Sequence, residues 1–547
     1  MQIQSLEDRV LLTGYFTSDD IVVQTGDAAP TVEAGETNGT FNGFSWGPII
    51  NESGQALFQA GINNSLNPND AGLFYTSSTG QVTMVARGKQ SIPAIPGGTL
   101  DTGISFNTVS SIPLPFNDHG QAVFLDHFSG DSILHTENAG IFIGTSGEEP
   151  SMVVREGSDA PGAMNGSTNG KFGEKRSNYV TINNSAQIAF LTLLLDTDNG
   201  NTDNDVIFGT DTNGTLFQIV REGQSIPGAS AGTFTSFNDP SINDAGQVAF
   251  MGFNNNNDLL DGIYVSNGNG AQLRVIAQEG DVFNSINEFF VDIKSTSHIN
   301  AVGDVAFKSS VEDGFTGVRP VSVFVRSENG TLREVVRRDD ILSNGETYLN
   351  NGNSIVLNNK GDVAFLGGSN ANRLYRGDAD ASERGDIKEI ARVGQTVPAS
   401  DLVFKTLRKF ALNDSRQIAF TATIWDGTES KSEREALFFY DDVYGLIEIV
   451  RAGDEVGGFP VSYINFAGND HQAFLPSNGD GLNNNGQVTF SYQLENGNQG
   501  VAIVDFSERI DVRVVTSSTN VDLNGETSSL PDNQNLISEW SSYSVEI

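Results

Sequence analysis

The sequence feature that most constrains the fold is a nine-residue signature that occurs eight times in fixed register. Its clearest copy is INDAGQVAF, residues 242–250, and the other copies begin at residues 50, 116, 182, 299, 357, 412 and 482. The Asn residues of successive copies are separated by 66, 66, 60, 57, 58, 55 and 70 residues. A period of this length corresponds to one supersecondary unit per repeat. The chain is therefore predicted to be a repeat protein.

Each copy consists of an apolar residue, four turn-forming residues and an alternating run that ends in Phe, which is typical of a tight β-hairpin. Asn at the first turn position can hydrogen-bond its own backbone, and Gly three residues later supplies a left-handed conformation. Ala186 and Arg416 replace that Gly in two copies, which predicts a different or strained turn there. We interpret the signature Asn, Gly and Phe as turn and core residues, not as an active site.

Two further runs follow each hairpin in most repeats. One is short and aromatic, such as GIFIGT at residues 140–145, and the other is β-branched, such as FQIVREG at residues 217–223. Each repeat therefore holds four strands, and no amphipathic helical window stands out. Four short strands repeated eight times predict an all-β fold, an eight-bladed β-propeller with four-stranded antiparallel blades.

The two ends of the chain predict how the ring closes. Residues 21–27 have the pattern of a fourth strand without the preceding three, whereas the last repeat runs into a divergent tail. We expect this N-terminal strand to complete the last blade, so that no sheet edge stays open. A rival for the same place is RIDVRVV, which begins at Arg509. The predicted organisation is a disordered leader (1–20), the propeller (21–506) and an acidic, polar tail (507–547).

Composition excludes several classes of function. The net charge of −38 argues against nucleic-acid binding, which requires Lys and Arg facing phosphates. The absence of cysteine removes disulfides, thiol nucleophiles and Cys-ligated metal sites. No apolar run is long enough to span a membrane. No GxSxG, HExxH or P-loop motif is present.

The most specific candidate for chemistry is an acidic loop after the second strand of the third repeat. Its alternating carboxylates, separated by small residues, could direct oxygens at calcium. The four candidate ligands are Asp196, Asp198, Asp203 and Asp205. The loop lacks the terminal Glu of a complete twelve-residue calcium loop, and the alternative is a solvated acidic loop.

Two smaller groups also have ligand-type residues. A shorter cation candidate precedes and enters the last signature turn, and it consists of Asn478, Asp480 and Asn484. Three histidines recur at eight-residue intervals in the second repeat: His119, His127 and His135. Because His119 lies in the hairpin turn, it is expected to face away from the other two.

Two resemblances bear on location. LEDRVLL, residues 6–12, resembles the LEPR-XLL motif of large exported proteins of planctomycetes and similar bacteria, with Asp8 in place of Pro. The array from about residue 20 to 505 resembles the NxxGxxAF tandem-repeat family, the "choice-of-anchor" proteins, although Leu57, Val123 and Thr489 depart from the Ala of that pattern. The resemblance implies a secreted or surface-attached bacterial protein. It implies no reaction, so it transfers no catalytic residue.

The leading hypothesis is a non-enzymatic secreted or cell-surface propeller that binds a polysaccharide or protein through its variable second-to-third-strand loops. The alternative is a calcium-dependent carbohydrate-active enzyme, a lyase or hydrolase that uses carboxylates on one face of the ring. A third possibility is an intracellular scaffold. An enzyme requires a deep pocket with perturbed carboxylates near the ring axis, and this requirement discriminates between the classes.

Overall fold

The computed structural model describes residues 15–509, with gaps, and the short strands β38 (Asn520–Val521) and β39 (Thr527–Ser528). The gaps within 15–509 are residues 31–38, 64–69, 78, 89, 96–97, 101–114, 130–136, 163–169, 174–179, 229–231, 255–260, 268–271, 283–287, 294–297, 350–353, 371, 429–431 and 470–479.

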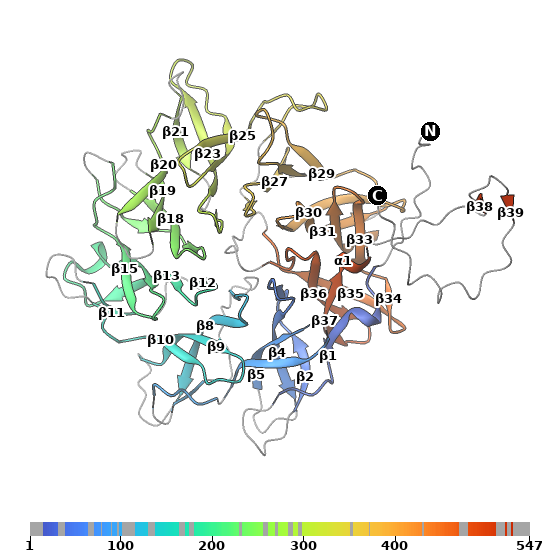
Figure 1. Cartoon of the computed structure of the whole chain (residues 1–547), viewed down its shortest axis with the longest axis horizontal. Helices are drawn as coiled ribbons and strands as arrows, with labels where there is room; N and C mark the ends of the chain where they lie inside the picture. The colour runs from blue at the N-terminus through green and yellow to red at the C-terminus, as the bar shows by residue number, and fades with distance from the viewer. Residues whose placement is uncertain are drawn as a thin grey trace.

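Eight small antiparallel sheets form an eight-bladed β-propeller, as predicted, and the chain passes once around the ring (Figure 1). Blade 1 contains β2 (Thr40–Phe44), β3 (Ile49–Ile50), β4 (Ala56–Asn63), β5 (Asp70–Thr76) and β6 (Val82–Arg87). Blade 2 contains β7 (Thr99–Leu100), β8 (Gln121–Ser129), β9 (Ala139–Thr145) and β10 (Ser151–Arg155). Blade 3 contains β11 (Lys171–Phe172), β12 (Val180–Ile182), β13 (Ile188–Leu195), β14 (Asp205–Thr210) and β15 (Leu216–Arg221). Blade 4 contains β16 (Ser236–Phe237), β17 (Ser241–Ile242), β18 (Gln247–Phe253), β19 (Gly262–Asn267) and β20 (Leu273–Gln278).

The second half of the ring repeats the arrangement. Blade 5 contains β21 (Glu288–Ile293), β22 (His298–Ile299), β23 (Val305–Asp313), β24 (Val321–Arg326) and β25 (Leu332–Arg337). Blade 6 contains β26 (Ile355–Leu357), β27 (Val363–Gly367), β28 (Arg373–Gly377) and β29 (Lys388–Arg392). Blade 7 contains β30 (Val403–Leu412), β31 (Ile418–Trp425), β32 (Arg434–Asp441) and β33 (Gly445–Arg451). Blade 8 contains β34 (Glu455–Val456), β35 (Phe459–Phe466), β36 (Gln487–Leu494), β37 (Gln499–Asp505) and β1 (Ile21–Gln24).

Helical structure is minor in the described part of the chain. It consists of two short 3-10 turns, η1 (Ser18–Asp20) and η2 (Gly200–Thr202), and the four-residue helix α1 (Phe506–Arg509). None of the helices that the structure describes is long and apolar enough to cross a membrane.

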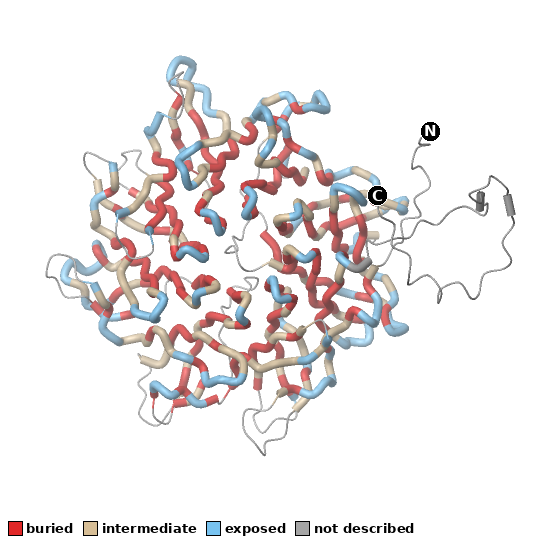
Figure 2. The backbone as a smooth tube through the Cα atoms, viewed as in Figure 1, coloured by how far each residue is buried: buried red, intermediate tan, exposed pale blue. Residues whose placement is uncertain are grey.

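The blades pack face to face, which explains why their middle strands are apolar on both sides. All six residues of β14 are buried, whereas the outer strand β15 is buried only in its second half. Figure 2 shows the same distribution, with buried segments along the strands and many exposed segments at the outer edge and in turns. A strict alternation of apolar and polar residues would leave one of the two packed faces without a core.

The N-terminal strand closes the ring, as predicted. β1 pairs antiparallel with β37, and the register joins Ile21 to Ala502 and Gln24 to Gly500. The rival segment begins at Arg509, the last residue of α1, and continues outside the described residues. Closure therefore places β1, the first strand that the structure describes, on the outer edge of blade 8.

Residue 16 completes the core of that blade. In blades 1 to 7 the signature Phe lies opposite an aromatic residue of the third strand, as Phe58 lies opposite Phe74. In blade 8, Phe490 lies opposite Ala502, which has no ring. Phe16 supplies one, with its ring centroid 5.1 Å from that of Phe490. Part of the predicted leader therefore packs in the propeller, while residues 1–14 lie outside the described part.

Replacing Phe16 should weaken ring closure. We expect Phe16→Ala to lower the free energy of unfolding by roughly 3–5 kcal/mol, because it removes a buried aromatic side chain. Chemical denaturation of the full chain measures the change. Phe459→Ala is the matched control, since Phe459 is 45% exposed and its loss should cost little. Equal losses in the two variants would contradict this role for Phe16.

Two ionisable side chains are buried between blades 5 and 6. Lys308 of β23 donates from Nζ to the backbone oxygen of Leu366 at 3.3 Å, and Nζ lies 5.5 Å from the centre of the Phe365 ring. Burial lowers the pKa of Lys308 to about 7 and that of His298 to about 4. Because His298 lies opposite Ala306, two residues before Lys308, the two side chains share one face of the sheet.

The buried amine should make stability depend on pH. Between pH 7 and 10.5 the unfolded chain binds the Lys308 proton and the folded chain releases it, so the free energy of unfolding rises with pH across this window. We expect Lys308→Met to stabilise the fold by roughly 3–5 kcal/mol at pH 7 and by little above pH 10.5. Urea unfolding at both pH values tests this. The exposed Lys360→Met should show no such pH-dependent gain.

Candidate functional site at the channel mouth

The signature turns have the predicted backbone geometry. In blade 1, the side-chain oxygen of Asn51 accepts from the backbone N–H of Gln55 at 2.9 Å, and Gly54 has a φ of 73°. Ala186 and Arg416 adopt the same left-handed conformation, with φ values of 56° and 63°. The two copies without Gly therefore carry local strain in an unchanged turn.

The signature Asn has a second role that the sequence interpretation missed. Each Asn side chain donates from Nδ2 to the backbone oxygen of the signature Asn in the next blade, at 2.9–3.1 Å. The eight bonds form a closed ring that runs through Asn51, Asn117, Asn183, Asn243, Asn300, Asn358, Asn413 and Asn483. All eight side chains are buried. The sequence did contain a signal, because Asn is kept in every copy while Gly is not.

The next residue of each turn forms what we call the channel rim. Its eight members are Glu52, Asp118, Asn184, Asp244, Ala301, Asn359, Asp414 and Asn484. They line a cavity of about 160 Å³ on the ring axis, together with Asp480. In seven of the eight steps around the ring, a backbone N–H of one rim residue donates to the side chain of the next. The remaining step, from Asp244 to Ala301, lacks this hydrogen bond because the Ala301 side chain has no acceptor.

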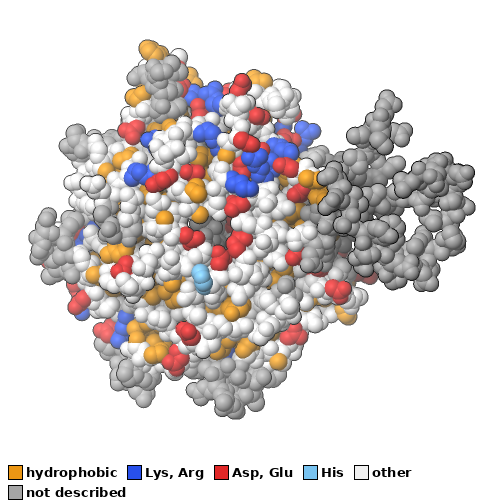
Figure 3. All heavy atoms as spheres, viewed as in Figure 1, with side chains coloured by type: hydrophobic (Ala, Val, Ile, Leu, Met, Phe, Trp, Pro, Cys, Tyr) orange, Lys and Arg blue, Asp and Glu red, His pale blue; other side chains and the backbone are white. Residues whose placement is uncertain are grey.

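Four of the rim residues are carboxylates, and acidic side chains gather at the centre of this face (Figure 3). Burial raises the pKa of Glu52 to about 7, and the nearby charges of Asp118 and Asp414 add to the effect. Burial also raises the pKa of Asp480 to about 7. Both carboxyl groups would therefore be stabilised by a positive charge in the cavity.

The predicted calcium ligands lie in and beside the loop between β13 and β14. Asp196 and Asp198 are exposed, whereas Asp203 and Asp205 are buried. Asp203 forms an ion pair with Arg221 at 3.1 Å, as Asp70 does with Arg87 at the equivalent place in blade 1. A cation at Asp203 would therefore compete with a structural arginine. No three acidic or His side chains gather as a metal site among the described residues, and calcium in this loop stays a prediction.

The residues of the two smaller candidate groups lie in different parts of the structure. Asp480 and Asn484 both line the axial cavity, while Asn478 lies outside the described residues. His119 lies in the signature turn of blade 2, and His127 lies near the far end of β8. His135 is outside the described residues.

A second concave region, the blade-6 cleft, has a volume of about 530 Å³. It lies between the β28–β29 loop, the connection from blade 5 and the signature turn of blade 7. Its lining residues are Leu342, Ser343, Asn344, Tyr375, Asp378, Asp380, Ala381, Asp386, Ile387, Lys388, Glu389 and Arg416.

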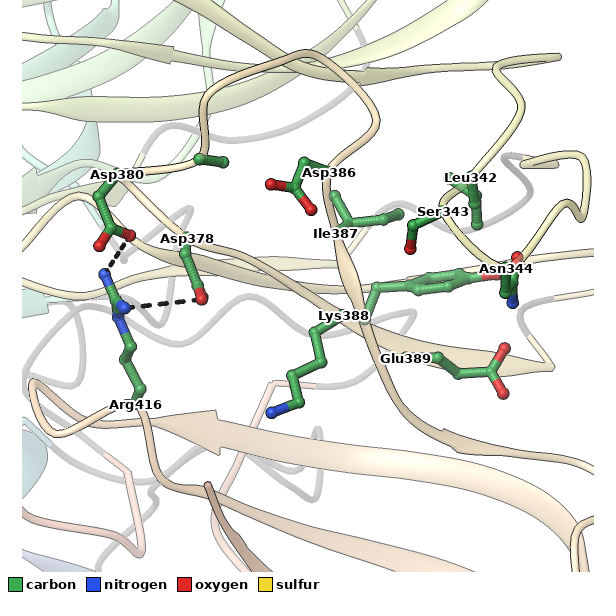
Figure 4. Close-up of a pocket in the computed structure, with 12 residues that line it drawn as sticks. Leu342, Ser343, Asn344, Asp378, Asp380, Asp386, Ile387, Lys388, Glu389 and Arg416 are labelled. Atoms are coloured by element: carbon green, nitrogen blue, oxygen red, sulfur yellow. Dashed lines mark hydrogen bonds and ion pairs between the residues drawn. The ribbon is translucent and has the colours of Figure 1, made fainter. Parts of the chain in front are cut away.

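Ion pairs hold the charged groups of the cleft in place. Arg416 lies 2.6 Å from Asp380 and 3.6 Å from Asp378 (Figure 4). Lys388 pairs with Asp442 at 2.7 Å. Although burial opposes it, hydrogen bonds from Arg376 and Lys388 hold the pKa of Asp442 well below its usual value. The cleft therefore offers fixed donors and acceptors whose charges are largely balanced.

The family model that matches this chain covers residues 10–228, 117–297, 225–350 and 346–507 in overlapping segments, as a repeat array would produce. The chain belongs to DUF7453, a family of unknown function. That description assigns no reaction or ligand to DUF7453. No curated protein matches the chain. The resemblance to the NxxGxxAF family stays a prediction.

Several solved structures are similar to this DUF7453 chain at low identity. An oligogalacturonate lyase in complex with manganese has 12% identity and a TM-score of 0.36, with 78% of this chain and 98% of that chain covered. The polysaccharide lyase Uly1 has 9% identity and a TM-score of 0.37, with 80% and 100% covered. The acylaminoacyl peptidase of Pyrococcus horikoshii has 11% identity and a TM-score of 0.35, with 83% and 58% covered. At these scores the likeness carries no argument about function.

Breaking one bond of the Asn ring should destabilise the propeller. Asn183→Asp keeps the acceptor for its own turn but loses the Nδ2 donor to Asn243, and it turns a carboxylate toward a buried carbonyl. We expect a loss of roughly 2–4 kcal/mol, measured by denaturant unfolding at pH 7. Asn213→Asp, in an exposed turn, is the control. A loss below the experimental error would show that the ring bond is dispensable.

Proposed function

We propose that this protein is a non-enzymatic binding module of the bacterial cell surface or exterior, and that it holds a neutral saccharide chain in the blade-6 cleft. The observation that carries the proposal is the cleft itself. Its volume of about 530 Å³ lies within the range of ligand-binding pockets. Location outside the cell rests on the sequence resemblance.

The chemistry of the lining supports a hydroxyl-rich ligand. Asp386 and Asn344 are exposed acceptors, and the ammonium group of Lys388 is a donor. Leu342 and Ile387 also line the cleft, but both are buried in the core, so polar groups make up most of the surface that a ligand can contact. Because ion pairs already fix Lys388 and Arg416, little side-chain entropy is lost when a ligand binds.

The raised pKa of Glu52 favours a second candidate, a carbohydrate-active enzyme that acts at the channel mouth. Its cavity of about 160 Å³ is below the usual size of a pocket that encloses a small-molecule ligand. All four rim carboxylates also accept hydrogen bonds from amides of neighbouring blades. These features favour binding over catalysis.

The binding proposal predicts an effect of removing one exposed acceptor from the cleft. A glycan array probed with labelled full-length protein should give a subset of neutral saccharides, and calorimetry with the best one should give a Kd that rises roughly tenfold in Asp386→Asn. Asp198→Asn, an exposed carboxylate on blade 3, should leave that Kd unchanged.

The same saccharides also test the enzyme candidate. We expect no product when they are incubated with the wild-type protein. Cleavage that disappears in Glu52→Gln would replace the binding proposal with the enzyme. Saccharide binding that is unaffected by Asp386→Asn would place the ligand elsewhere on the ring.

A further inference from the structure

We propose that Arg416 is the positioning residue of the blade-6 cleft, and that it fixes the β28–β29 loop, residues 378–387, as the wall against which a ligand binds. The effect of Arg416 on ligand affinity rests on the saccharide proposal. Its effect on the loop does not, and the two effects are measured separately.

Two departures from the repeat meet at this cleft. In blades 1 to 5 the turn between the third and fourth strands has five residues, such as residues 327–331 of blade 5, but the β28–β29 loop has ten. Arg416 of blade 7 occupies the turn position that is Gly in six of the eight signature copies. Because binding normally resides in loops that vary on a rigid scaffold, the two changes draw attention to the junction of blades 6 and 7.

The signature turn of blade 7 holds Arg416 in a strained conformation. Its φ of 63° lies in the left-handed region that Gly adopts freely, and such strain persists where the surroundings compensate for it. At most copies a Gln of the preceding blade crowds this position, since a Cβ on Gly54 would lie 2.8 Å from Oε1 of Gln487. The preceding blade presents the shorter Asp362 to Arg416, so the arginine side chain has both room and a partner.

The guanidinium group of Arg416 crosses from blade 7 to blade 6. Nη2 lies 2.6 Å from Oδ1 of Asp380, and Nη1 lies 3.6 Å from Oδ2 of Asp378, both in the β28–β29 loop (Figure 4). Nε lies 3.1 Å from Oδ2 of Asp362, which is fully buried. The other oxygen of Asp362 accepts from the backbone N–H of Ala379 at 2.7 Å. Arg416 therefore joins the buried base of the loop to its exposed part at Asp380.

Asp362 also connects the loop to the ring of signature Asn side chains. Its Oδ2 accepts from Nδ2 of Asn358 at 2.9 Å. The same amide of Asn358 donates to the backbone oxygen of Asn413, which begins the turn that contains Arg416. The loop therefore has a defined position relative to the Asn ring.

A second arginine, Arg384, fixes the far part of the loop to blade 5. Its Nε and Nη2 donate to the two oxygens of Asp340 at 3.1 and 2.9 Å, and its Nη1 donates to Glu334 at 3.0 Å. Arg384 is itself exposed, whereas the Asp362 partner of Arg416 is fully buried. Because solvent screens a buried ion pair less than an exposed one, Arg416 makes the stronger of the two attachments.

Arg416 acts on a ligand through the loop and not as a receptor for an anion. Three carboxylates surround its guanidinium group, so it offers no net positive charge to the cleft. A wall that is fixed before binding reduces the conformational entropy lost when the complex forms, and affinity increases.

Hydrogen–deuterium exchange of the full chain without ligand tests the effect on the loop. In Arg416→Gly, which restores the residue of the other copies, peptides that cover residues 378–387 should exchange roughly tenfold faster than in the wild type. Ala186→Gly removes the same kind of turn strain in blade 3 and should leave their exchange unchanged. No increase in Arg416→Gly, or an equal increase in Ala186→Gly, would overturn the proposal.

Asp380→Asn keeps this test independent of the folding of Arg416→Gly. The Asp380 side chain is 74% exposed, so its replacement removes the contact with Arg416 and leaves the core unchanged. It should also accelerate exchange in residues 378–387, and circular dichroism confirms that each variant is folded. Unchanged exchange in Asp380→Asn would show that this contact does not hold the loop.

Calorimetry with the saccharide that binds best tests the effect on the ligand. Its Kd should rise roughly tenfold in Arg416→Gly and less in Arg416→Lys, which keeps the charge but not the planar fork. Faster loop exchange with an unchanged Kd would overturn the positioning role. If no saccharide binds the wild type, the binding function is wrong, and the exchange experiment alone decides whether Arg416 fixes the loop.

Discussion

The structure depends on one hydrogen bond repeated around the axis, from the side-chain amide of each signature Asn to the backbone of the next blade. Only a carboxamide meets both demands of this position, because it accepts from its own turn and donates to its neighbour. An Asp could accept but not donate at neutral pH, and a Ser has a single short hydroxyl. The ring of amides fixes the spacing of the innermost turns. Every group on the axis, including the rim carboxylates, takes its position from that spacing.

The axial cavity and the blade-6 cleft differ in how the charges of their lining residues are balanced. Around the axis, Asn184, Asn359 and Asn484 separate the carboxylates and hydrogen-bond several of them, but the net charge of the lining stays negative. In the blade-6 cleft, arginine and lysine side chains pair with the acidic groups. The lining of the axial cavity is therefore electronegative, whereas most charges of the cleft lining are paired. Because the chain has a net charge of −38, the positions of its Lys and Arg residues decide which acidic regions are neutralised locally.

Repetition made the architecture predictable. The period, the four strands and the closing strand follow from copies that can be aligned with one another, and the structure bears them out. Contacts between different parts of the chain were harder to predict. The sequence predicts Asp203 as a calcium ligand but does not indicate its ion pair with Arg221, which lies 18 residues later. The role of Phe16 could be suspected only from the missing aromatic at Ala502. Asp480 and Glu52 are 428 positions apart in sequence, and only ring closure brings them to one cavity.

The place of Phe16 and β1 in blade 8 has a consequence for synthesis. These residues precede blades 1 to 7 in the chain, whereas their partners Phe490 and Ala502 follow those blades, so they are synthesised long before their partners. Blades 1 to 7 can form in order during synthesis. During that time the Phe16 side chain and the hydrogen-bonding edge of β1 remain exposed to solvent. A chain that stops short of blade 8 has nothing to cover them. The ring can therefore close only after blade 8 has been synthesised. In an incomplete product the Phe16 side chain and the edge of β1 stay exposed, where chaperones or proteases can recognise them.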